Sequence, residues 1–281
     1  MSVPPTPDRL SAILARFDLR ARVFHTGSLC GMASFDPAGH VGHLHLLRSG
    51  RLRVTHGQGE EQHFDRPCLL YFAGRAPHQL LTAPDDPVDL LCASVDFGAG
   101  VGNPLVASLP DMLAIDLERL PGLAALLDLL FAEAFAQYCG RQAALDRLSE
   151  LLILHLLRHV MTEQRVEGGS LAGLADPKLL HALVAIHEEP ARPWSLAELA
   201  SRCGMSRARF AAHFRAVVGS TPGDYLADWR VALAMRLLRQ GRPAKSVALD
   251  VGYANASALA RVFGARVGHS PKAWLAQAEA A

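Results

Sequence analysis

The sequence predicts an α+β protein of two domains: an antiparallel β-barrel with trailing helices, then an all-α domain of two tandem helix–turn–helix units. Between residues 22 and 97, short apolar runs are separated by Gly, Pro and Asp, which is typical of closely spaced antiparallel strands. Beyond residue 176, apolar residues recur at helical spacing between helix-capping residues. The 281 residues suffice for two hydrophobic cores, and we expect domains at 1–165 and 177–281.

The expected elements of residues 1–165 are a short helix, a set of strands and two longer helices. Apolar residues at helical spacing predict the short helix over 9–17. Two apolar stripes, which begin at Leu123 and Leu145, predict a pair of antiparallel helices. These stripes could pack on the barrel or against the same helices of a partner subunit, in which case the chain forms a homodimer. Strands are expected at 44–47, 51–54, 68–72 and 88–95.

A polar stretch with Gly168-Gly169-Ser170 at its centre predicts a linker over 166–176. Beyond it, capping residues divide the chain into seven expected helices. Asp176-Pro177 is expected to open the first, and Ser195 with Glu198 has the spacing of a capping box. Further helix starts are expected at Ser206, Thr221-Pro222, Pro243, Asn255 or Ala256, and Ser270-Pro271.

Charge is distributed unevenly along the chain. Lys178 and the residues after it contain 14 Lys and Arg against 7 Asp and Glu, whereas the preceding residues contain 14 against 20. A basic C-terminal part is what binding to a phosphate backbone requires, although a solvated basic surface has the same composition. The five cysteines contain no Cys-x-x-Cys pair, which favours a reducing compartment. Because neither a signal peptide nor a membrane span is visible, a soluble cytoplasmic protein is expected.

The C-terminal part has the pattern of two helix–turn–helix units. Gly204 and Gly252 provide the tight turns, and a helix with an anchored apolar face follows each of them. This part resembles the DNA-binding domain of the AraC/XylS family of bacterial transcription regulators. The residues that carry the resemblance are Met205-Ser206-Arg207, Phe210, Phe214, Gly219, Thr221-Pro222, Tyr225-Leu226, Arg230, Ala234, Leu237-Leu238, Asp250-Val251-Gly252-Tyr253, Arg261, Phe263, Gly268 and Ser270-Pro271.

The resemblance implies double-stranded promoter DNA and RNA polymerase as partners, and more often activation than repression. Among the positions that it places at the DNA, Arg261 is the first candidate for a base contact and Arg209 the second. Arg207, Arg215 and Lys272 are candidates for phosphate contacts, although any one arginine could instead be a solvent-facing charge. The remaining positions are Ala208, Ala211, Ala212 and His213 in the first reading helix, and Ala256, Ser257 and Ala260 in the second.

The N-terminal part resembles the cupin-type sensor domain of the same regulators. The resemblance rests on Gly42-His43-Leu44-His45-Leu46-Leu47-Arg48-Ser49-Gly50 and Phe72-Ala73-Gly74-Arg75-Ala76-Pro77-His78. His43 and His45 alternate to one side of a strand, and a barrel could bring His78 opposite them, so the three imidazoles are a possible divalent-metal site. A ligand pocket lined by these histidines and purely structural histidines are the alternatives. No Glu follows His45 at the metal-binding distance, and His40 and His63 are further candidates.

Some sensors of this cupin subgroup respond to reactive chlorine species through cysteines. The resemblance places Cys92 at such a position, with Cys30 as an approximate partner, so Cys30, Cys92, His45 and His78 form the candidate effector or redox site. For Cys68, Cys139 and Cys203, a buried apolar role is the simpler interpretation.

The leading hypothesis is therefore a sequence-specific transcription activator that is controlled by a small molecule or an oxidant at the cupin domain. Coupling would run through the helices from Leu123 to Val160 and the linker. The alternative is a cupin metalloenzyme with an incidental helical domain, and a third possibility is an architectural DNA-binding protein without an effector. We expect no enzymatic activity, because the histidines lack the Glu and other paired carboxylates.

Overall fold

The computed structural model describes residues 8–36, 41–74, 77–83, 85–98, 103–163 and 168–280. The chain folds into two compact units. The sandwich unit contains Leu19–Gly100 and Leu109–Val160, and the helical unit contains Met1–Asp18, Val101–Ser108 and Met161–Ala281. Within the described residues, no helix is both long and apolar enough to cross a membrane.

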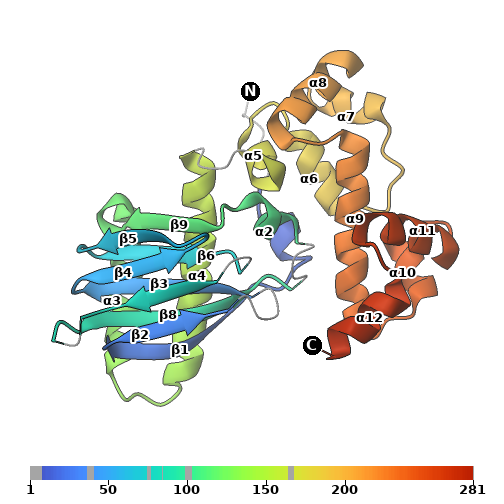
Figure 1. Ribbon diagram of the computed structural model, residues 1–281. Helices are drawn as coiled ribbons and strands as arrows, with labels where there is room; N and C mark the ends of the chain where they lie inside the picture. Colours follow the sequence, from blue (N-terminus) through green and yellow to red (C-terminus); the bar gives the residue numbers. More distant parts are fainter. Residues whose placement is uncertain are drawn as a thin grey trace. The chain divides into compact units, whose positions relative to one another are not determined.

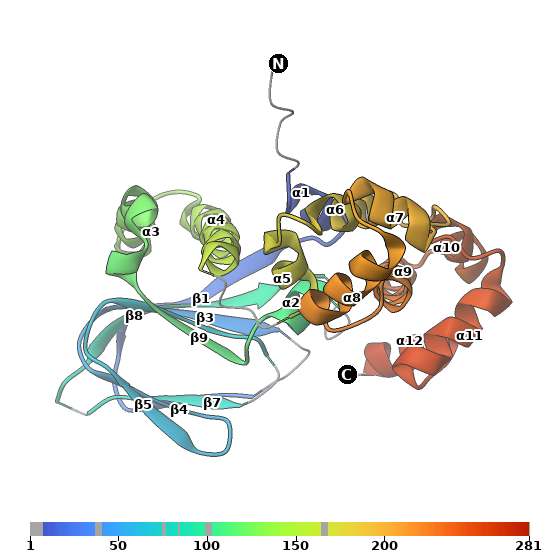
Figure 2. The same ribbon diagram turned by 90° about the horizontal axis from the view of Figure 1, so that it is seen from above.

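The sandwich unit consists of two antiparallel sheets (Figures 1 and 2). Strand β3 (Gly42–Ser49) lies at the centre of the five-stranded sheet because it pairs with both β6 and β8. The five-stranded sheet has the order β1 (Arg20–Leu29), β8 (Val88–Asp96), β3, β6 (Cys68–Phe72) and β9 (Met112–Asp116). The four-stranded sheet has the order β2 (Met32–Phe35), β7 (His78–Leu81), β4 (Leu52–His56) and β5 (Glu60–Phe64).

The predicted fold class is confirmed, with one difference in the N-terminal domain. The expected barrel is an open sandwich, because the described strands form two separate hydrogen-bonded sheets. A core of inward-facing side chains fills the space between the sheets, including Leu47, Val54, Leu70, Leu80 and Leu90. The apolar side of each strand is therefore buried by packing of one sheet on the other, and a closed barrel is not needed.

The helices of the sandwich unit lie on the outer side of the five-stranded sheet (Figure 2). Two 3₁₀ turns, η3 (Leu117–Arg119) and η4 (Pro121–Leu123), lead into α3 (Ala124–Phe135) and α4 (Arg141–Thr162). The prediction of two helices from the apolar stripes is correct. Arg141 fastens the pair, since it donates to the Glu133 carbonyl at 3.1 Å and to Thr26 of β1 at 2.7 Å.

Residues 177–280 contain the seven helices that the capping pattern predicts. Their starts agree with the sequence at Ser195, Ser206, Thr221 and Asn255, whose side chains accept hydrogen bonds from backbone amides. The helices are α6 (Leu180–Glu188), α7 (Leu196–Arg202), α8 (Arg207–Val218), α9 (Pro222–Arg239), α10 (Ala244–Asp250), α11 (Ala256–Val267) and α12 (Pro271–Ala280). The first begins three residues later than expected, since 177–179 form a turn.

The expected linker is corrected where it is described, because Gly169–Ala175 form the helix α5. Leu171 and Leu174 are fully buried in the helical unit. A Cβ atom at Gly173 would lie 2.4 Å from the Leu183 side chain and 2.9 Å from that of Val218. Glycine therefore permits close helix packing here, whereas the glycine-rich sequence predicts a flexible stretch. Residues 164–167 lie outside the described residues.

Two short segments from the N-terminal part of the sequence belong to the helical unit. One contains α1 (Ser11–Leu14), which is shorter than the expected helix, and the other contains α2 (Pro104–Ser108). Beyond α1, the Phe17 ring meets the Trp229 ring edge-to-face at 5.2 Å. Arg16 donates to the Glu188 carbonyl at 2.9 Å. The ring contact covers part of the buried face of α9, and the hydrogen bond attaches the segment to the end of α6.

Candidate nucleic-acid interface and sensor site

Two capped helices, α8 and α11, hold the positions that the sequence resemblance assigns to DNA reading. Phe210 and Phe214 anchor α8, and Leu259 and Phe263 anchor α11; all four side chains are fully buried. Helix α9 connects the two helix–turn–helix units (Figure 1). Its 18 residues correspond to a rod of about 27 Å, on the scale of the 34 to 36 Å between successive major grooves.

Most of the candidate DNA-contacting side chains are free to meet a duplex. Among the residues that the structure describes, Arg207, Arg209 and Arg261 form no ion pair with one another or with any other side chain. This leaves their charges available for phosphate or base contacts. The exposed candidates are Arg207, Arg209, Ala212, Arg215, Ser257, Arg261 and Lys272.

His213 is the candidate that the structure places differently. Its Nε2 lies 2.9 Å from Asp176 Oδ2, and the ring is partly buried. The other oxygen of Asp176 accepts hydrogen bonds from the backbone amides of Lys178 and Leu179. His213, which was expected at the DNA-reading face, therefore forms a bond that fastens α8 to the turn before α6. Nothing in the sequence pattern links positions 37 residues apart in this way.

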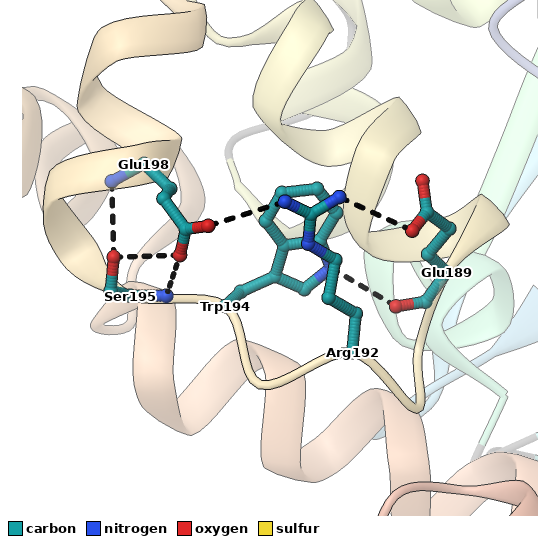
Figure 3. Close-up of polar contacts among 5 residues, drawn as sticks. All are labelled: Glu189, Arg192, Trp194, Ser195 and Glu198. Atoms are coloured by element: carbon teal, nitrogen blue, oxygen red, sulfur yellow. Dashed lines mark hydrogen bonds and ion pairs between the residues drawn. The ribbon is translucent and has the colours of Figure 1, made fainter.

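The loop between α6 and α7 is held by a cluster of five residues (Figure 3). Arg192 bridges Glu189 and Glu198 at 3.4 and 3.2 Å, and its guanidinium lies over the Trp194 ring. Trp194 Nε1 donates to the Glu189 carbonyl at 3.0 Å. Ser195 and Glu198 form the predicted capping box, and the amide of Ser195 is the main cause that lowers the pKa of Glu198 to about 2.

The sequence assigned no role to two arginines, Arg266 and Arg230, that hold the elements of the helical unit together. Arg266 of α11 pairs with both Asp224 and Asp228 of α9. Arg230 of α9 donates to backbone carbonyls of the loop that contains Arg192. The acceptors lie 38 to 42 residues away in the sequence, so no local pattern could reveal these bonds.

In the sandwich unit, the rings of His43, His45 and His78 lie close together. His45 Nε2 lies 2.9 Å from His78 Nε2, and both side chains are buried. The His43 ring lies 6.2 and 5.3 Å from the rings of His45 and His78. Phe72 stacks on the His78 ring at 3.7 Å, and Phe35 stacks on it at 4.9 Å. The cluster is thus an aromatic box in which His78 is held between two phenyl rings.

The box does not fit a metal ion in this arrangement. Across the described residues, no group of three or more His, Cys, Asp or Glu side chains has a geometry that could hold one. Burial, and then the neighbouring His78, His43 and His25, lowers the pKa of His45 well below its ordinary value. His45 is therefore neutral and bonded to His78. Of the further candidates, His63 lies on β5 and is largely exposed, and His40 lies outside the described residues.

The cysteine arrangement argues against a thiol switch between Cys30 and Cys92. In the five-stranded sheet, Cys92 of β8 lies opposite His25 of β1 on one side and opposite His45 of β3 on the other. Cys30 comes five residues after His25. Five residues at about 3.3 Å each place the Cα atom of Cys30 about 16 Å from that of Cys92. This distance is far beyond the limit of about 7 Å for a disulfide. Burial also raises the pKa of the Cys92 thiol to about 12. The proposed redox role of Cys92 is thus opposed by its environment.

This environment predicts slow modification of Cys92 in the folded chain. Its side chain is 2% exposed, whereas Cys139 is exposed. A pKa three units above that of an ordinary thiol reduces the thiolate fraction roughly a thousandfold. Iodoacetamide labelling at pH 8, followed by mass spectrometry, is expected to modify Cys139 and to leave Cys92 intact. Equal labelling rates of Cys92 and Cys139 in the native chain would contradict the prediction that folding protects Cys92. The denatured chain is the control, because both thiols are exposed in it.

A cavity of about 550 Å³ lies beside the aromatic box. Phe72, which stacks on His78, also forms part of its wall. The polar groups around it are His56, Gln58, Glu60, Gln62 and Asp111, and the apolar ones include Met112 and Ala114. This volume is within the range of small-molecule pockets, about 300 to 1,000 Å³. Through Phe72, this concave site lies next to the histidines singled out from the sequence.

Comparisons with known proteins agree with both parts of the chain. Residues 8–162 match the cupin family, and residues 199–277 match a helix-turn-helix domain family. An HTH-type transcriptional regulator of Haemophilus influenzae is 35% identical over 245 residues, which cover 79% of this chain and 82% of that protein.

Two further relatives match over a smaller share of their length. An AraC-like transcription regulator of Streptomyces antibioticus is 41% identical over 128 residues, which cover 45% of this chain and 42% of that relative. The RCS-specific HTH-type transcriptional activator RclR of Escherichia coli is 28% identical over 202 residues, or 72% of this chain and 61% of that protein. The cupin match over more than half of the chain and the Haemophilus relative show that this chain belongs to the AraC/XylS family of transcription regulators, with an N-terminal cupin domain.

Proposed function

We propose that this chain binds double-stranded promoter DNA sequence-specifically and activates transcription in response to a small molecule. The observation that carries the proposal is the pair of capped, separately anchored helices α8 and α11, whose outer faces expose unpaired arginines at either side of α9. Such helices can enter two successive major grooves. Arg207 and Arg215 would bind phosphate groups, and Arg209 and Arg261 would reach base edges.

The signal that we propose is a polar small molecule in the 550 Å³ cavity of the sandwich unit. His56, Glu60 and Gln62 supply hydrogen-bonding groups, and Phe72 connects the cavity to the aromatic box. An oxidant acting at Cys92 is less well supported, because the thiol is buried and its pKa is raised. A metabolite panel tested by thermal shift would identify the ligand, and Gln62→Ala provides the matched variant.

We also propose that two copies of the chain associate in the cytoplasm through α3 and α4 and act together on RNA polymerase. Four large apolar side chains are exposed on or beside these helices: Leu129 (53%), Phe135 (49%), Tyr138 (66%) and Leu151 (41%). Exposed apolar groups of this size are typical of association surfaces. Sedimentation analysis of the wild-type chain and of Leu129→Ser with Leu151→Ser would test this pairing.

The DNA-binding proposal is tested by selection from a pool of randomised duplexes. We expect the full chain to enrich a common sequence with two half-sites and to protect both in a footprint. A chain that enriches no sequence and binds all duplexes equally at physiological salt would rule out sequence-specific regulation. A cupin enzyme with an incidental helical domain would instead bind no duplex at all, so the same experiment separates this hypothesis from the regulator.

A further inference from the structure

One side chain, Arg230 in the middle of α9, connects the two helix–turn–helix units. Its Nε donates to the Pro190 carbonyl at 2.7 Å, and its Nη2 donates to the Arg192 carbonyl at 2.9 Å. On the other side, its guanidinium lies over the Tyr253 ring at 5.6 Å. Pro190 and Arg192 precede the first unit, and Tyr253 follows the turn of the second.

At the same place, the backbone of the second helix–turn–helix unit touches the loop that precedes the first unit. Gly252, the turn glycine of the second unit, has a φ of +88°. A Cβ atom there would lie 2.7 Å from both Cα and O of Ala191, and 2.9 Å from Nη2 of Arg230. The turn thus rests directly on the loop before α7, and only glycine permits both the backbone conformation and the close approach.

The loop that receives Arg230 is itself fixed. The cluster of Glu189, Arg192, Trp194, Ser195 and Glu198 holds its conformation (Figure 3), and the capping box starts α7, which packs against the reading helix α8. On the opposite side, Arg266 ties α11 to Asp224 and Asp228 of α9. A displacement of the Arg230 side chain would therefore change the position of α8 relative to α11.

The guanidinium of Arg230 is committed to these bonds and is not placed to bind a phosphate. The two bonds use separate nitrogens, Nε and Nη2, which the planar guanidinium holds at fixed positions, whereas lysine has a single nitrogen without this planar geometry. The side chain is partly buried, and this burial lowers its pKa from the ordinary value.

We propose that Arg230 is a positioning residue that sets the distance and rotation between α8 and α11, and thereby the spacing of half-sites that the chain accepts. The inference rests on the proposed function, since it presupposes binding to two half-sites. One additional base pair moves the second half-site by about 3.4 Å and rotates it by roughly 35° about the duplex axis. A rigid connection should reject this change, whereas a loosened one should tolerate it.

The experiment uses the full chain and the duplex selected by the wild-type protein. Dissociation constants are measured for that duplex and for versions whose spacer is one base pair shorter or longer. We expect at least a tenfold weakening for the wild type, and less than threefold for Arg230→Ala and Arg230→Lys. Arg242→Ala is the matched control, because it removes an exposed arginine of the second unit that pairs only with Asp250 within the described residues.

The salt dependence of binding separates positioning from phosphate contact. Removal of a phosphate contact should lower the slope of log K against log salt by about 1, whereas the slope for Arg230→Ala should equal that of the wild type. Retained spacing discrimination in both Arg230 variants, or a reduced slope, would overturn the inference while leaving the DNA-binding proposal intact. If Arg230→Ala unfolds, Arg230→Lys decides the outcome. A wild-type chain that selects no duplex would overturn both proposals.

Discussion

Acidification from pH 7.5 to pH 5 is expected to destabilise the helical unit through His187. The side chain is fully buried, and burial lowers its pKa from 6.5 to about 3. The unfolded chain therefore binds a proton below pH 6.5 that the folded chain excludes. Stability is complete above pH 6.5 and decreases as the pH falls from 6.5 towards 3, by about 1.4 kcal/mol per pH unit for one such histidine.

Tryptophan fluorescence can follow this loss in the helical unit alone, because Trp194, Trp229 and Trp274 all belong to it. His187→Gln is expected to be less stable at pH 7.5, since it loses the packing of the imidazole on Trp229 at 4.2 Å. It should nevertheless show a smaller decrease in unfolding temperature between pH 6.5 and pH 5. An equally steep decrease in the variant would refute the assignment to His187. His45 should act in the same direction in the sandwich unit.

Replacement of Arg261 by alanine is expected to weaken binding to the selected duplex by about 1 to 3 kcal/mol and to relax the base preference of one half-site. The side chain is exposed on α11, and no described residue forms an ion pair with it. A titration at fixed salt against the selected and a scrambled duplex measures both quantities.

Lys272→Ala provides the contrast to Arg261→Ala. The lysine is exposed near the start of α12 and is a candidate for a phosphate contact. Its removal should weaken binding to both duplexes by a similar factor and lower the salt slope by about 1. Unchanged affinity and unchanged base preference in Arg261→Ala would remove that residue from the interface.

The helical part of the fold could be predicted well because its signals are local. Ser195, Ser206, Thr221 and Asn255 cap the helices that they were expected to cap, since each cap requires only a few neighbouring residues. Strand β6 was predicted with its observed bounds, because both of its faces are buried and its sequence is continuously apolar. The linker was misjudged at α5, where Gly168 precedes a buried helix, Gly169 begins it and Gly173 lies within it.

The candidate sites were predictable only to the extent that their residues share one strand or helix. His43 and His45 alternate along β3, and the approach of His78 follows from the resemblance. That His45 and His78 bond to each other, between two phenylalanines, depends on contacts between the two sheets. The same is true of His213, whose partner Asp176 lies 37 residues away.

The helical unit is assembled from three separate stretches of chain, which has a consequence for recombination between related genes. A fusion that transferred only residues 177–281 to another sensor would leave Phe17, α2 and α5 behind, although Phe17 covers the Trp229 ring and α5 packs against α6 and α8. Exchange of sensors should therefore succeed when the crossovers lie near the ends of the sandwich strands, so that the new sensor enters as an insert within the DNA-binding unit. In this architecture, the sensor domain is an insertion within the sequence of the DNA-binding unit.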